Sequence, residues 1–237
     1  MAVVAAAAVA AAPAQARVVK RLDFESGSLR QWTDVQALRG RIKTVRSPVG
    51  QGHYAARFVV RPGDHPVMGG ERAELVWLSG EHAGVKSRWR WKTLFPSDFH
   101  PTQNSAWNYF TQWHHSGYSC APPVAFGVTT FTGHPRIRLD IRGGRLHVGS
   151  CSASHHRVWT LQRVRSNRWY SFDFVVKWSP YRSRGFISLR LNGRRVIRKT
   201  HVATLYKGQG VYLKQGLYRS PSNRTSVVYE DGMTRSR

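Results

Sequence analysis

The chain contains 237 residues, of which 41% are hydrophobic and 21% are charged. Its 37 Lys and Arg residues outnumber its 12 Asp and Glu residues, which gives a formal net charge of +25 at pH 7. A field of this strength attracts anionic ligands and repels cationic ones, so the expected partner is a polyanion. The net charge alone is compatible with nucleic acid, an acidic polysaccharide or an anionic membrane surface as the partner.

The amino-terminal segment is typical of an export signal. Residues 1–12 are an uncharged run of mainly Ala and Val, too short to cross a bilayer, and residues 14–16 have the small-x-small form of a signal-peptidase site. No Lys or Arg precedes the apolar run, which departs from a standard signal. We expect residues 1–16 to be removed and residues 17–237 to form one secreted domain. Secretion favours a polysaccharide among the polyanions.

The chain has two cysteines, Cys120 and Cys151. In an oxidising compartment they can form a disulfide, and closing a loop of this length contributes about 3 to 4 kcal/mol in the chain-entropy model. The alternative is two separate thiols. Their spacing does not match a zinc site.

From residue 17 onward, short runs rich in aromatic and β-branched residues alternate with turns that contain Gly, Pro, Asn and Ser. No segment has the pattern of a long amphipathic helix. This spacing predicts an all-β sandwich or jelly roll, with His155 and His156 in an exposed, Ser-rich basic loop after Cys151. The expected strands are 54–60, 73–78, 86–95, 107–114, 124–131, 136–142, 145–149, 169–178, 185–191, 194–200, 211–218 and 226–230.

Two groups of side chains on these strands are candidate contacts for an acidic glycan. Arg136, Arg138 and Arg142 alternate with apolar residues, and a guanidinium can bind a carboxylate or sulfate as a fork. The same row can equally be solubilising charge on a wet face. Trp91 and Trp107 can stack on sugar rings.

Three of the expected strands carry chemically suitable residues at a spacing of two or four. Side chains two apart on a strand point to the same face, so Gln112 and His114 stand together while Trp113 points to the core. The same spacing places Arg72 and Glu74 on one face at the start of strand 73–78. It also places Lys214, Gly216 and Tyr218 on one face of strand 211–218. We expect the three strands to form one site.

Residues 70–75, 112–114 and 212–218 resemble, in order, the three motifs of the jelly-roll polysaccharide lyases, which include alginate lyases, glucuronan lyases and heparin lyase I. The segments 23–27, 61–64, 177–180 and 191–193 are more similar to the glucuronan and heparin lyases. The resemblance covers nearly all of the chain after residue 16. It implies a concanavalin-like β-jelly roll, and an active site at the three motifs.

The resemblance assigns a role to each motif residue. It implies that Arg72 and Gln112 bind the uronate carboxylate, that Lys214 and Glu74 belong to the same substrate-binding set, and that His114 and Tyr218 transfer protons. Such donors favour the enolate-like transition state that forms when the C5 proton leaves. Glycoside hydrolysis needs two placed carboxylates, and no convincing pair is present, so elimination is the expected reaction.

Substrate stereochemistry decides how the proton transfers divide. When the C5 proton and the leaving oxygen lie on the same side of the ring, as in mannuronate, Tyr218 can act as base and acid. When they lie on opposite sides, His114 would be the base. A tyrosine base needs nearby positive charge, which Arg72 and Lys214 would supply.

Each site residue also has a plainer interpretation. Arg72 and Glu74 can be an exposed ion pair, His114 beside His115 a surface feature or a chance metal ligand, and Tyr218 an interior aromatic.

No organic cofactor is expected. Lyases of this group often hold a structural calcium, for which the candidate oxygen ligands are Asp23, Glu25 and Asp231 near the two ends of the chain.

We therefore expect a secreted, monomeric polysaccharide lyase that cleaves a uronate polymer by β-elimination. A glucuronan-like chain is the first candidate substrate, and heparin-like chains and alginate come next. The alternative is a non-catalytic carbohydrate-binding module or lectin for acidic glycans on the same fold. Neither a membrane nor a nucleic acid is an expected partner, because no nucleic-acid motif is recognised.

Overall fold

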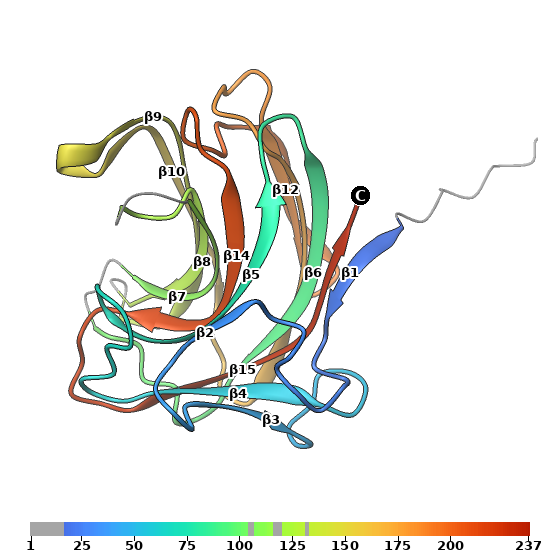
Figure 1. Ribbon diagram of the computed structural model, residues 1–237, viewed down its shortest axis with the longest axis vertical. Helices are drawn as coiled ribbons and strands as arrows, with labels where there is room; N and C mark the ends of the chain where they lie inside the picture. Colours follow the sequence, from blue (N-terminus) through green and yellow to red (C-terminus); the bar gives the residue numbers. More distant parts are fainter. Residues whose placement is uncertain (1–16, 104–106, 116–119, 131–132) are drawn as a thin grey trace, which may run out of the picture.

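The computed structural model describes residues 17–103, 107–115, 120–130 and 133–237, which fold into two antiparallel β-sheets packed face to face (Figure 1). The expected signal segment, residues 1–16, lies outside the described residues. In the described part of the chain, the one helical element is the 3-10 turn Val148–Ser150. None of it forms a helix long and apolar enough to span a bilayer.

One sheet, here called the outer sheet, is built from eight of the described strands. In spatial order they are β13 (Arg194–His201), β12 (Phe186–Leu191), β11 (Arg168–Lys177), β6 (Lys86–Phe95), β15 (Ser226–Ser236), β4 (Ala55–Val60) and β3 (Ile42–Val45), with β1 (Val18–Leu22) also paired to β15.

The other sheet, here called the groove sheet, is built from seven of the described strands. In spatial order they are β10 (Ser152–Arg163), β9 (Arg136–His147), β8 (Val124–Thr129), β7 (Asn108–His115), β14 (Val211–Arg219), β5 (Glu71–Glu81) and β2 (Asp34–Gln36). Strands far apart in the sequence are therefore neighbours, and β14 lies between β5 and β7.

Alternating residues decide which side of each strand enters the core. Along β11, Tyr170, Phe172, Phe174 and Val176 are buried, while the residues between them are partly exposed. This is the period of two expected for a sheet with one wet side. The fold class predicted from the sequence is confirmed.

The space between the sheets is filled by aromatic rings. Trp91 stacks on Phe172 with ring centroids 4.7 Å apart, and meets Phe126 edge-on at 5.0 Å. Trp113 packs against Trp91 at 6.0 Å. The expected role of Trp91 as a sugar platform is wrong, because its side chain is only 1% exposed and lies between the two sheets.

The sequence located most strands but not all of them. Strands β1, β2 and β3 were not expected, because they are only three to five residues long and mix apolar with polar residues. The segment around His155 and His156 is not a loop but strand β10, which was hidden because most of its residues are exposed. The expected strand 145–149 is the last part of β9 followed by the 3-10 turn.

Strands β9 and β10 form a long hairpin that projects from the groove sheet (Figure 1). A disulfide between Cys120 and Cys151 ties the tip of this hairpin to the segment that precedes β8, with a Cα–Cα distance of 5.1 Å. The predicted pairing of the two cysteines is confirmed.

The tryptophan core gives a test of the fold. We expect Trp91→Ala to lower the free energy of unfolding by about 3 to 5 kcal/mol, because it removes a buried ring and leaves a cavity. Urea unfolding followed by fluorescence measures the change. Trp107→Ala, at a partly exposed position, is the control and should cost much less. Equal costs for the two variants would contradict this description of the core.

Candidate active site

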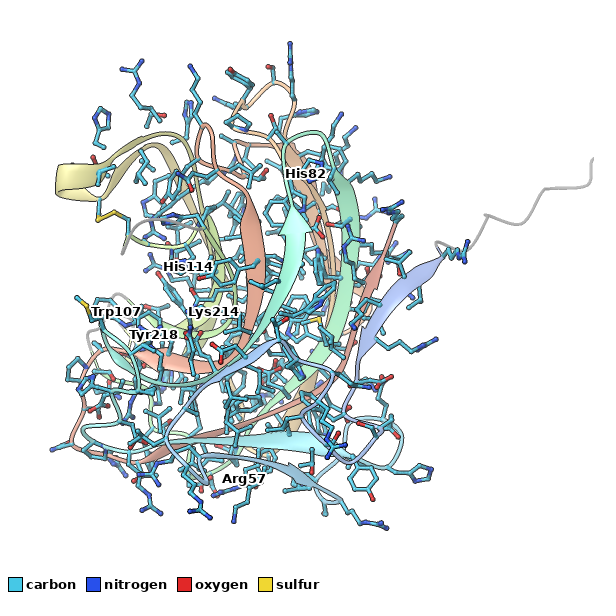
Figure 2. All side chains as sticks on the ribbon, viewed as in Figure 1. Arg57, His82, Trp107, His114, Lys214 and Tyr218 are labelled. Atoms are coloured by element: carbon cyan, nitrogen blue, oxygen red, sulfur yellow. A yellow bond between two sulfur atoms is a disulfide. The ribbon has the colours of Figure 1, made fainter. Side chains whose placement is uncertain are left out.

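A cavity of about 510 Å³ opens on the groove sheet, and is here called the groove cavity. Its floor is formed by side chains from β2, β5, β7 and β14, and its walls by segments 67–69 and 120–122. Figure 2 shows Trp107, His114, Lys214 and Tyr218 gathered on this side of the molecule. The three predicted site strands therefore meet at one cavity.

The register of the strands explains how these residues come together. Tyr218 is directly opposite Arg72 on β5, and Lys214 is directly opposite Gln112 on β7. Directly opposed residues are nearest neighbours on the same face of a sheet. The Arg72 guanidinium carbon consequently lies 4.0 Å from the centre of the Tyr218 ring.

Glu74 connects the cationic side chains beneath the cavity. Its Oε1 accepts a hydrogen bond of 2.5 Å from Gln112 Nε2. Its Oε2 lies 3.4 Å from Arg72 Nη1 and 3.8 Å from Lys214 Nζ. Arg72, Glu74, Gln112 and Lys214 are 6%, 2%, 1% and 3% exposed. Glu74 and Gln112, both expected to contact substrate, do not line the cavity; they support Arg72 and Lys214, which do.

The ion-paired side chains of the buried cluster carry more positive than negative charge. Arg72 and Lys214 contribute two cations, and Glu74 contributes one anion within ion-pair distance of both. Arg72 Nε is buried without a hydrogen-bond partner in the described structure. Burial lowers the pKa of Lys214 below its ordinary value, although Glu74 opposes the shift. A carboxylate entering the cavity would balance the charge.

The main chain approaches Tyr218 closely at Gly69 and Gly70, because glycine has no side chain. The Gly70 N–H points to the Tyr218 hydroxyl oxygen at 3.4 Å. Gly69 has a φ of +108°, and a Cβ there would lie 2.8 Å from Arg72 Nη2 and 3.1 Å from the Tyr218 hydroxyl. The sequence analysis assigned no role to this pair, although the available signal was two adjacent glycines, one directly before the first motif and one at its start.

His114 is held as a neutral imidazole. Its Nδ1 lies 2.6 Å from the carbonyl oxygen of His115. Because a carbonyl can only accept, Nδ1 carries the proton, and the lone pair of Nε2 stays available. Burial, followed by the charge of Lys214, lowers the pKa of His114 to about 3. The side chain lines the cavity, so it can accept a proton there or hold a polar group.

Comparison with known proteins identifies the family. A family model described as "Polysaccharide lyase" matches residues 24–234. The chain belongs to this polysaccharide lyase family. The groove cavity is accordingly the candidate active site of a polysaccharide lyase. The sequence matches none of the curated proteins to which it was compared.

Solved structures share the fold of the lyase. The endo-β-1,4-glucuronan lyase from the fungus Trichoderma reesei has 17% identity and a TM-score of 0.73, covering 93% of this chain and 95% of that one. An alginate lyase from a Chlorella virus has 11% identity and a TM-score of 0.58, covering 93% and 100%. A catalytic domain of a glycoside hydrolase family 131 protein from Coprinopsis cinerea has 10% identity and a TM-score of 0.56, covering 93% and 94%.

The arginines of β9 are arranged differently from the expectation. Arg138 and Arg142 lie on the same face as the cavity, but both pair with Asp140, which is 0% exposed. His156 Nε2 reaches the same carboxylate at 2.9 Å. Arg136 lines a separate cavity of about 480 Å³ with His134, Thr160 and Arg163. These arginines do not line the groove cavity itself, although Arg142 interacts with Tyr109, which does. Their contact with an acidic glycan stays a prediction.

The wall opposite segment 67–69 was not recognised from the sequence. Cys120 and the two residues after it line the cavity. The disulfide holds this wall on one side, and the Tyr206 hydroxyl donates to the Ala121 carbonyl at 3.0 Å. Trp107, on the other hand, lines the cavity as expected, and its ring centroid lies 6.0 Å from that of Tyr218.

The candidate calcium ligands hold a loop in the described structure. Both Glu25 and Asp231 accept main-chain N–H groups from segment 50–54, and Asp23 accepts the N–H of Glu25. Asp231 Oδ1 is buried without a hydrogen-bond partner. The described residues contain no group of three His, Cys, Asp or Glu side chains that could hold a metal ion. Calcium stays a prediction, and no step below depends on it.

The Glu74 contacts lead to a direct test. We expect Glu74→Gln to reduce kcat/KM of the lyase by about 10- to 100-fold, because Arg72 and Lys214 lose their shared anion and repel each other. Steady-state kinetics on a uronate polymer measures the effect.

The matched control is Glu81→Gln, which breaks the buried pair of Glu81 with Arg235. Glu81→Gln should lower the free energy of unfolding by about as much as Glu74→Gln does, but it should leave kcat/KM of the folded protein nearly unchanged. If both variants lose activity equally, Glu74 has no special role in the cavity.

Proposed function

We propose that this lyase is secreted and cleaves a glucuronate-rich polysaccharide by β-elimination at the groove cavity. The observation that carries the proposal is the buried surplus positive charge of Arg72 and Lys214 in the cavity that Tyr218 also lines, with Arg72 against the Tyr218 ring. A uronate is the sugar whose carboxylate matches this charge. The disulfide is consistent with an oxidising compartment.

Carboxylate binding is the first function of the site. Arg72 and Lys214 would hold the uronate carboxylate, which makes the neighbouring C5 proton more acidic because negative charge spreads onto that group as the proton leaves. Gln112 and Glu74 keep the two cations in place without contacting the sugar. Preorganised cations cost little reorganisation when the charge develops.

Proton transfer is the second function. D-Glucuronate and D-mannuronate share the configuration at C4 and C5, so the C5 proton and the leaving oxygen lie on the same side of the ring. Tyr218, as the phenolate, would take the C5 proton; the electron pair forms the C4–C5 double bond, and the C4–O bond breaks. The same hydroxyl then protonates the leaving oxygen. The products are a chain with an unsaturated uronyl end and a chain with a new reducing end.

His114 would support this reaction from the carboxylate side. For a C5 epimer, in which the proton lies on the opposite face, His114 Nε2 would be the base and Tyr218 the acid. In either case the Gly70 N–H lies 3.4 Å from the Tyr218 oxygen, and the Arg72 guanidinium carbon lies 4.0 Å from the centre of the Tyr218 ring.

Hydrolysis is less consistent with the site, although a glycoside hydrolase shares the fold. Hydrolysis by the usual mechanism needs two carboxyl groups on either side of the scissile bond. Among the described residues, neither Asp nor Glu lines the groove cavity, and Glu74 below it is occupied by cations. The glucuronan lyase likeness supports glucuronan as the first substrate, with heparin-like chains and alginate as further candidates.

The direct test is incubation with glucuronan, alginate, heparin and hyaluronan while the absorbance of the new double bond is followed. The proposal predicts the fastest rise with glucuronan. Binding to these polymers without a rise on any of them would support a carbohydrate-binding module or lectin instead.

Removal of one hydroxyl separates chemistry from binding. We expect Tyr218→Phe to reduce kcat on glucuronan by at least about 1000-fold with little change in polymer affinity, because only the proton-transfer group is lost. Tyr212→Phe, on the same strand, is the matched control and should retain most of kcat. A Tyr218→Phe enzyme with normal turnover would remove this residue from the mechanism.

The pH dependence tests the state of His114. Because its pKa is lowered to about 3, the imidazole stays neutral where a free histidine would titrate. We expect kcat/KM to show no acid-side step near about pH 6.5. On the alkaline side, KM should rise before free lysine would titrate, since the pKa of Lys214 is lowered and its deprotonation removes a carboxylate-binding charge. A step near neutrality that disappears in His114→Asn would contradict this assignment.

A further inference from the structure

The exposed face of the outer sheet carries a second concentration of positive charge. Arg90, Asp173, Arg190 and Arg195 are directly opposite one another on β6, β11, β12 and β13, so their side chains form one row across four strands. The core-facing neighbours of this row are buried aromatic and aliphatic residues. The row therefore points away from the groove cavity, on the opposite side of the sandwich.

The acidic residue in this row is already paired. Arg88 binds both carboxylate oxygens of Asp173, at 2.6 and 2.5 Å, and Arg90 Nε lies 3.7 Å away. Burial alone would raise the pKa of Asp173, but the hydrogen bond and charge of Arg88 lower it below its ordinary value. The carboxylate therefore stays ionised and paired with Arg88. Its charge also acts on Arg190, but in the described residues it forms no ion pair with Arg190, Arg195 or Lys199.

Three cations beyond Asp173 surround a hollow. Arg190, Arg195 and Lys199 line a cavity of about 200 Å³ together with Ser188 and two core residues of β12 and β13. Arg190, Arg195 and Lys199 are here called the outer cationic cluster. All three side chains are exposed, and none of them makes an ion pair in the part of the chain that the structure describes.

Two side chains of the outer cationic cluster are held by contacts with neighbouring residues. Arg190 Nη1 donates to the Gly193 carbonyl at 3.1 Å, and the Lys199 ammonium lies 4.6 Å from the centre of the Phe186 ring. These contacts hold two of the charges near the cavity. The Ser188 hydroxyl lines the same cavity and can donate to a carboxylate or to a sugar oxygen.

We propose that the outer cationic cluster is a second, non-catalytic binding site for an acidic polysaccharide. The proposal rests on the proposed function, since it takes the substrate polymer as the occupant. A chain held on this face leaves the groove cavity open for another part of the same chain or for a neighbouring chain. Binding at two sites raises the effective concentration of polymer at the catalytic cavity without any new contact there.

The experiment compares long and short substrates. The test variant combines Arg195→Ser with Lys199→Ser and leaves the Arg190 hydrogen bond to Gly193 intact. On polyglucuronate we expect kcat/KM to fall by about fivefold, and on its tetrasaccharide to stay within about twofold of the unmodified enzyme. The variant should also elute from immobilised polyglucuronate at lower salt, because two ionic contacts to the polymer are lost.

The matched control removes two charges elsewhere, by Arg30→Ser combined with Arg184→Ser, both exposed residues outside the strands. It should change elution and polymer turnover much less than the test variant. Equal changes in the two variants would mean that only net charge matters, and would overturn the site. An equal loss of activity on the tetrasaccharide would also overturn it, because the effect would then act through the groove cavity.

Two further results keep this inference separate from the proposed function. If the unmodified enzyme cleaves no uronate polymer, the proposed function fails, while elution from polyglucuronate still reports on the outer cationic cluster. If duplex DNA retains the unmodified enzyme more strongly than polyglucuronate does, and only the test variant loses that retention, the polysaccharide is the wrong occupant.

Discussion

The interaction on which the site depends is the sharing of one buried carboxylate by two buried cations. Glu74 lies within ion-pair distance of Arg72 and Lys214, and Gln112 fixes its remaining oxygen. Removing two charges from water for a single opposite charge is costly. A substrate carboxylate reduces that cost, so the arrangement links the stability of the site to the chemistry that it performs. A neutral sugar would leave the imbalance in place.

The fold makes this arrangement possible because it joins three distant segments. Strand β14 lies between β5 and β7, and the register brings Tyr218 opposite Arg72. The side chains on the other face of these strands are packed aliphatic and aromatic residues, among them Leu75, Leu213 and Trp113. Dense packing of this kind resists displacement of the strands. The cations above it therefore keep their spacing when substrate is absent.

Sequence periodicity predicted the shared face of each motif, because side chains two apart on a strand point the same way whatever the strand pairs with. It could not predict how deeply each side chain is buried. Gln112 and Glu74 were expected to contact the sugar, but their side chains are buried and do not line the groove cavity, since only tertiary packing decides which polar groups reach the surface of a cavity. Trp91 was misjudged for the same reason. Strand β10 was missed because its exposed polar residues carry no alternating pattern, and its place depends on pairing with β9.

A crystal structure of the Tyr218→Phe enzyme with a glucuronate trisaccharide tests carboxylate binding by Arg72 and Lys214 most directly. We expect one uronate carboxylate to contact both cations, and the C5 carbon of the same sugar to face the ring edge from which the hydroxyl was removed. An oligosaccharide bound with its carboxylates directed away from these two cations, or bound outside the groove cavity, would show that the buried cations do not bind the substrate.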